Sequence, residues 1–230
     1  MIDTLDSRSL RPTDCYGQRF MKVGSYRYGV LAAHTDCMTD ERPFTIRAVE
    51  RKAKTRMTQH TISVRVDAGA FRVDRHELVV EVGDLVLWHC PNQKAPPYMV
   101  AGDKEFFGSQ RLLNESGYSH AFGFAGEYQW IDAYGGRAAG VVRVHDPQCR
   151  DPGDFQRWHK SLTKGTLVMI TDGAAEPPEV DIVTGQTVFF AIVKGPGISI
   201  TDQRLIARAE DKPAKPFTNR TPSARRAAAR

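Results

Sequence analysis

The sequence of 230 residues lacks several features that would assign it to a common class of protein. Its four cysteines include no Cys-x-x-Cys pair, so neither a zinc site of the usual spacing nor a dense disulfide framework is expected. No apolar run approaches the ~20 residues of a membrane span. The polar N-terminus, which carries acids, differs from a secretory signal. We therefore expect a cytoplasmic protein with free thiols and no membrane span.

Motifs for catalysis are also missing. The segment GGRAAG, residues 135–140, lacks the lysine of a phosphate-binding loop and does not precede a helix. Ser109 and Ser116 have no His–Asp pattern nearby, and no other nucleophile, general base or oxyanion arrangement is evident. These absences predict a protein that is not an enzyme.

The net positive charge comes from one end of the chain. The net charge is +5, and the last twenty residues, 211–230, carry six Lys or Arg and one Asp, which leaves residues 1–210 neutral. This tail is rich in Pro, Ala and Arg, so we expect it to be flexible and to act either as an interaction arm or as a solubilising arm. Nucleic acid is not expected as the main partner. The basic residues of this tail are Lys212, Lys215, Arg220, Arg225, Arg226 and Arg230.

Strand patterns dominate the remainder. Residues 61–66 (TISVRV) alternate apolar and polar side chains, which is typical of a strand with one buried face. Gly and Pro separate most of the segments, and one helix is expected at 154–162 (DFQRWHKSL) as a linker. An all-β sandwich or barrel class follows. The other expected strands are 78–82, 85–88, 127–131, 139–144, 166–170, 187–193 and 198–200.

Two internal repeats indicate duplicated structure. In the front-half repeat, VEVGDLVLW at 80–88 matches IVTGQTVFF at 182–190, with an aliphatic residue three before the glycine and an aromatic residue five after it. In the back-half repeat, Gly-x-Tyr segments at 126–130 and 24–28 each follow a phenylalanine by four positions. The terminal fragments are therefore complementary, and neither can bury its apolar face alone.

The repeats predict the following division of the chain. Residues 58–147 form a complete domain, and 148–163 form a linker helix. Residues 1–57 (back half) pair with 164–210 (front half) as a second unit, joined within one chain or swapped between chains, and residues 211–230 are the flexible tail.

The middle segment resembles the cupredoxins, the blue-copper fold of plastocyanin and amicyanin. The matching stretches are VEVGDLVLWHCPN (80–92), PPYMV (96–100), the Phe-x-Ser to Gly-x-Tyr stretch at 106–130 and GVVRV (140–144). The resemblance implies two cupredoxin-like Greek-key β-sandwiches. Its copper ligands would fall on Tyr98, Asp132, Gly135 and Ala138. A blue-copper centre needs a thiolate and two imidazoles. The loop is therefore expected to be structural, without copper or another cofactor. Asp132 and Tyr98, with Tyr134 as a further member, could form a hydrogen-bonded pair in the vacated pocket.

A metal site of another kind remains as the alternative. The soft ligands of the segment AAHTDCM and of the end of one strand could bind copper or zinc if the fold brings them together, although His89 and Cys90 should face opposite sides of their strand. These residues are His34, Cys37, Met38, His89 and Cys90. The main expectation is a structural or accessory protein that binds a protein partner, such as a redox or multi-subunit complex, as a homo-oligomer or hetero-complex. The alternative is metal handling or electron transfer.

Overall fold

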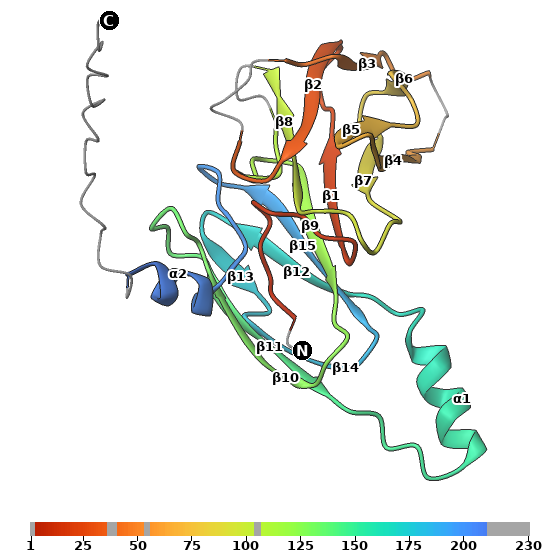
Figure 1. Ribbon diagram of the computed structural model, residues 1–230, viewed down its shortest axis with the longest axis vertical. Coiled ribbons are helices and arrows are strands. Elements are labelled where there is room, and N and C mark those ends of the chain that lie inside the picture. The colour runs from red at the N-terminus through yellow and green to blue at the C-terminus, as the bar shows by residue number, and fades with distance from the viewer. Residues whose placement is uncertain (1–2, 36–40, 53–55, 104–106, 211–230) are drawn as a thin grey trace, which may run out of the picture.

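The computed structural model of the protein describes residues 3–35, 41–52, 56–103 and 107–210. Strands make up most of this part of the chain, so the expected all-β class is confirmed (Figure 1). The first eight strands are β1 Asp14–Arg19, β2 Gly24–Ala32, β3 Phe44–Val49, β4 Gln59–Asp67, β5 Ala70–Val73, β6 Glu77–Glu81, β7 Leu85–His89 and β8 Tyr98–Gly102. The next eight are β9 Ser116–Ala121, β10 Gly126–Ile131, β11 Ala139–His145, β12 Thr166–Thr171, β13 Ala174–Glu176, β14 Glu179–Val183, β15 Thr187–Lys194 and β16 Thr201–Asp202.

Three sheets build two sandwiches that share a layer. The shared sheet has eight strands in the order β13-β12-β15-β9-β1-β7-β4-β5, and the two smaller sheets have the orders β14-β11-β10-β16 and β6-β3-β2-β8. Each small sheet packs on one half of the large one. Tyr28 of β2 meets Trp88 of β7 with ring centroids 5.4 Å apart, and Trp130 of β10 meets Phe190 of β15 at 5.3 Å. Buried residues of both sandwiches belong to one hydrophobic cluster.

The two sandwiches repeat the same order of strand pairing. We call β1–β8 unit 1 (residues 14–102) and β9–β16 unit 2 (residues 116–202). In unit 1, β1 pairs with β7, β2 with β3 and β8, and β3 with β6. In unit 2, β9 pairs with β15, β10 with β11 and β16, and β11 with β14. The chain is thus a tandem repeat in which each unit places its back half before its front half.

The expected division into domains was wrong about which halves join. Residues 58–147 do not form one sandwich, because β4–β8 belong to unit 1 and β9–β11 to unit 2. The back half at 1–57 pairs with the front half that directly follows it, and the front half at 164–210 pairs with the back half that directly precedes it. A repeat identifies equivalent strands, but it does not say which copies share hydrogen bonds.

Local sequence explains the strands and their turns. In β4, Ile62 and Val64 are fully buried while their neighbours are not, as the alternation predicts. The β4–β5 and β12–β13 hairpins turn on two residues of positive φ, Ala68-Gly69 and Asp172-Gly173, which is the type of turn that suits the twist of a hairpin. The expected strand at 198–200 was wrong, because Ile198 makes an isolated bridge and β16 begins at Thr201.

The units meet edge to edge through β1 and β9. These strands run antiparallel with Tyr16 opposite Tyr118, which occupy equivalent places in the two repeats, so the junction has approximate two-fold symmetry. Two segments cross it: the N-terminal strap (residues 5–10) and the central strap (residues 108–112). Each strap forms one backbone bridge with each unit. The four bridges are Asp6 to Thr201, Leu10 to Tyr98, Gly108 to Ala101 and Leu112 to Ile198.

Two helices accompany the sheets. The expected linker helix is confirmed as α1, Pro152–Ser161, with Asp151 as its N-cap, and it connects β11 to β12. A second helix, α2 (Gln203–Glu210), follows β16 and was not expected. Across the described ranges, no helix has the length and apolar character required to cross a bilayer.

Candidate functional site

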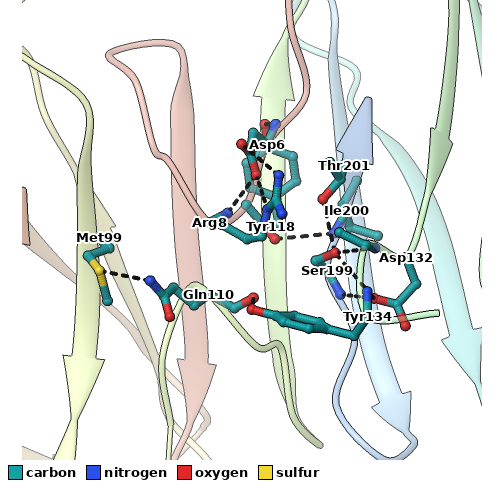
Figure 2. A network of polar contacts seen from close by, with 12 residues as sticks. Asp6, Arg8, Met99, Gln110, Tyr118, Asp132, Tyr134, Ser199, Ile200 and Thr201 are labelled. Atoms are coloured by element: carbon teal, nitrogen blue, oxygen red, sulfur yellow. Dashed lines mark hydrogen bonds and ion pairs between the residues drawn. The ribbon is translucent and has the colours of Figure 1, made fainter. Parts of the chain in front are cut away.

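The loop after β10, where the resemblance places the copper ligands, is closed by its own hydrogen bonds (Figure 2). Asp132 Oδ1 accepts from the backbone N–H of Ser199 at 2.9 Å and from that of Tyr134 at 3.1 Å. Its Oδ2 accepts from the N–H of Gly136 at 3.0 Å, and the hydroxyl of Ser199 adds a bond of 3.2 Å to Oδ1. The side chain at the thiolate position is therefore a buried carboxylate with four donors, and it folds the loop onto the segment before β16.

The two other ligand positions in this loop also have structural roles. Gly135 has a φ of 82°, in the left-handed region that favours glycine, and its N–H donates to the carbonyl of Asp132 at 3.2 Å. Ala138 is 1% exposed, and its carbonyl accepts from the N–H of Asp132 at 2.9 Å. Neither side chain offers a metal an electron pair.

Tyr98 does not join Asp132, which corrects the expected hydrogen-bonded pair. Tyr98 lies on β8 in unit 1, whereas Asp132 follows β10 in unit 2. The phenol of Tyr98 is fully buried and its oxygen has no partner among the described residues. Burial raises its pKa well above the ordinary value, and the nearby Cys15, Cys90 and Asp14 raise it further. The side chain therefore stays a neutral phenol.

The structure describes three of the five candidate ligands of the alternative metal site. Cys37 and Met38 lie outside the described residues. His34 is exposed on the turn after β2. Half-buried His89 ends β7, and fully buried Cys90 follows it outside the strand. The described ranges contain no cluster of three His, Cys, Asp or Glu side chains placed to hold a metal.

A buried acid–imidazole pair lies at the seam between the units, and sequence reasoning missed it. His120 Nδ1 of β9 is 2.6 Å from Asp14 Oδ1 of β1, directly across the ladder. The hydroxyl of Tyr118 donates to the same oxygen at 2.8 Å, and the N–H of Arg11 donates to Oδ2 at 2.7 Å. Asp14 is 0% and His120 is 1% exposed. His120 Nε2 has no partner among the described residues.

The approximate two-fold symmetry gives this pair a neutral counterpart. The ladder partner pair Gln18 and Ser116 occupies the places equivalent to His120 and Asp14. There the hydroxyl of Tyr16 donates to Gln18 Oε1 at 3.0 Å, while Ser116 donates to the carbonyl of Leu113. The ionisable pair is therefore not required by the fold, since the same place in the other half holds uncharged groups.

A chain of polar contacts runs from this seam to the closed loop (Figure 2). The backbone N–H of Asp6 donates to the Tyr118 hydroxyl at 3.3 Å, and Ile200, in the segment before β16, donates through its N–H to the hydroxyl of Ser7 at 3.2 Å. On the other side, the hydroxyl of Tyr134 donates to the carbonyl of Gln110 at 3.2 Å. Both straps are thus fixed to unit 2 by hydrogen bonds as well as by packing.

Two open clefts lie along the central strap. One, of about 590 Å³, is lined by apolar residues of β8 and the strap, with Gln110, Arg111 and Tyr134 among its polar residues. The Arg111 guanidinium lies over the Tyr134 ring, 5.4 Å from its centroid. The second cleft, of about 680 Å³, shares Phe107 and Leu113 with the first. Neither cleft is lined by the seam pair or by Asp132.

A third feature is the face of the eight-stranded sheet that points away from both small sheets. We call it the outer face and define it by Leu85, Leu87, Leu167, Met169, Phe189 and Val193. Leu167, Met169 and Val193 are 50%, 45% and 45% exposed, and the other three are half-buried. Contiguous exposed apolar residues of this kind are a common mark of an interaction surface.

The repeat supplies an internal comparison for that face. Leu167 and Met169 stand beside Phe189 and Ala191, whereas the equivalent neighbours in unit 1 are Thr61 and Ser63 beside Leu87 and His89. The places on β12 are thus apolar in unit 2, and the equivalent places on β4 are polar in unit 1. The apolar character of unit 2 is a property of its sequence and not of the architecture.

Comparison of the chain with protein-family models, with curated proteins and with solved structures gave no match in any of the three.

Proposed function

We propose that this protein is a copper-free, cupredoxin-like accessory protein that acts by binding other proteins and not by catalysis. The observation that carries the proposal is the closed loop around Asp132. A thiolate position occupied by a carboxylate with four hydrogen bonds is committed to holding the loop and the segment before β16 together. A metal at this place would have to displace those donors.

The junction supports a scaffold role. Two sandwiches connected by a continuous ladder and by two straps form one extended platform, because a relative motion of the units would break backbone bridges on both sides of the seam. Platforms of this kind present surfaces at a fixed separation. The apolar outer face is the surface best suited to binding, and its β12 strand carries Leu167 and Met169 where the equivalent strand of unit 1 carries Thr61 and Ser63.

The function is tested by titration of the purified protein with Cu(II) and with Cu(I) under a competing chelator. We expect no tight stoichiometric binding and no thiolate charge-transfer band in the visible spectrum. A blue sample with one tight equivalent of copper would overturn the proposal.

A Cys37→Ser/Met38→Leu variant separates the alternative function from adventitious metal. Metal handling predicts one tight equivalent in the wild type that is lost in this variant. The accessory function predicts that both proteins bind metal equally weakly. Elemental analysis of the protein from its native source gives the same distinction without reconstitution.

A further inference from the structure

The outer face is broad, nearly uncharged and covered by no described element. Five adjacent strands contribute to it: β12, β15, β9, β1 and β7. Within these five fully described strands, the side chains on this face or at its end that are charged at neutral pH are Arg19 and Lys194. The Arg19 guanidinium donates to the carbonyl of Gly83 at 2.7 Å, and Lys194, the register partner of Thr171, lies 3.3 Å from Asp172. A charged partner surface would find nothing complementary here.

Close packing at the seam keeps this face continuous from one unit to the other. Phe189 of β15 lies over Gly117, where an added Cβ would be 2.5 Å from the ring, and Leu87 of β7 lies over Gly17, where it would be 2.9 Å from a methyl group. Gly17 and Gly117 are ladder partners. The apolar side chains of the two units therefore converge above the seam and are not divided by a polar ridge.

The area of the face matches what a dimer needs. With strands ~4.8 Å apart and successive outward residues ~6.8 Å apart, five strands by three rows cover about 500 Å². Two copies placed face to face would bury about 1,000 Å², the lower bound of a specific interface.

From these observations we infer that the outer face binds a second copy of this chain. The inference rests on the proposed accessory function and names the partner of its main surface. In an isologous contact the same patch faces itself, so a neutral apolar face is its own complement and needs no opposite charge. Stacking of two sheet faces ~10 Å apart is also a standard way in which sheets pack. Leu167 and Met169 lie on β12, at one end of the five strands, and supply its most exposed apolar side chains, while Thr61 and Ser63 lie on β4, beyond the other end.

The test is sedimentation equilibrium of the full chain over a wide range of concentration. We expect a concentration-dependent mass that approaches twice the 25.7 kDa of one chain. Leu167→Thr/Met169→Ser, which gives unit 2 the residues that unit 1 carries at these places, should raise the dissociation constant at least about tenfold. Val79→Thr is the matched control: Val79 is 43% exposed but lies on β6, away from the outer face, and its loss should leave the mass curve unchanged.

The possible outcomes distinguish failure of the proposed dimer from failure of the proposed accessory function. A wild-type mass of one chain at every concentration overturns the dimer, and so does a dimer that Leu167→Thr/Met169→Ser leaves intact. If the wild type is monomeric and copper-free, the accessory function stands and the face serves another partner. If it binds copper tightly, the function fails whatever the mass. Thermal unfolding of the double variant checks that it is folded, because both substituted side chains are half exposed in the single chain.

Discussion

The seam between the units offers a sharp test of why one half of the junction carries an ionisable pair. Three variants are compared: Asp14→Ser, His120→Gln and the double variant. The double variant gives this half of the junction the same Ser–Gln pair that the other half carries. Asp14→Ser leaves the His120 Nδ1 and the Tyr118 hydroxyl without their acceptor in a site with almost no solvent access. Two such groups, at ~1–3 kcal/mol each, make a cost of about 3 kcal/mol.

His120→Gln leaves a buried carboxylate that keeps its donors from Arg11 and Tyr118, and the new amide can still reach it, so we expect a cost of about 2 kcal/mol. The double variant removes both the orphaned carboxylate and the orphaned imidazole. Its cost should stay near about 2 kcal/mol and not reach the sum of about 5, because the equivalent place already accommodates Gln18 and Ser116.

Urea unfolding followed by tryptophan fluorescence gives the three free energies and the coupling between the sites. In a chain of this size, 3 kcal/mol corresponds to a fall in Tm of roughly 6–12 °C, which a thermal scan checks independently. Ser116→Ala, which removes only a bond to the Leu113 carbonyl, is the control and should cost about 1 kcal/mol. If the double variant costs the sum of the single variants within ~0.5 kcal/mol, the two side chains do not act as a pair and the reasoning is refuted.

Three further outcomes are expected. Burial alone would raise the pKa of Asp84, but hydrogen bonds from Thr58, Arg51, His60 and Glu81 lower it below its usual range. The Asp84 carboxylate therefore contributes fully to the free energy of unfolding above its unfolded-state pKa of ~3.9, and this contribution is lost as the pH falls toward its folded-state pKa. We expect Asp84→Asn to reduce the loss of stability at acid pH, as measured by urea unfolding between about pH 2 and 7. Asp132→Ala should destabilise the protein by about 2–4 kcal/mol without changing copper binding in the titration, since it removes a carboxylate with four donors; unchanged stability would show that the loop does not depend on it. Gly117→Ala should cost about 2–4 kcal/mol because the added methyl meets Phe189 and the Phe190 carbonyl, whereas Gly195→Ala, with open space around it, should cost less than ~1, and equal losses would contradict the close packing at the seam.

Part of the fold was accessible from the sequence because some elements depend on local patterns, but the strands β1, β3, β5, β8, β9 and β13 were not among those expected. Alternation in 61–66 and the aromatic residues after the repeated glycines predicted strands within one or two residues of their observed bounds. The helix before β12 followed from Pro152 and the polar residues around it. The helix α2 at Gln203–Glu210 was not expected either.

The pairing of the halves was harder to predict, although a signal existed. Phe122 follows Phe20 by 102 positions, and Gly185 follows Gly83 by the same 102. One common interval for both repeats indicates a tandem duplication, in which each unit is continuous in sequence. The family order of the halves suggested instead that the middle segment was one domain. Loop-closure entropy favours the nearer partner by only about 1 kcal/mol, so it could not by itself decide the question.

The candidate sites were also hard to predict, because they depend on contacts between residues that are distant in sequence. The resemblance drew attention to Asp132 as the expected thiolate position, but the bonds of this residue to Ser199 depend on a contact 67 residues away. The seam pair joins residues 106 apart, and no motif surrounds either one. Both features arise where segments distant in sequence meet, and such contacts depend on which halves pair. Once the tandem order is known, the comparison of Asp14 and His120 with Ser116 and Gln18, and of Leu167 and Met169 with Thr61 and Ser63, follows from the interval and the strand registers. In a duplicated fold, places where the two copies differ in chemistry while agreeing in structure are the places where stability alone does not determine the residue, and in this chain they lie at the seam and on the outer face.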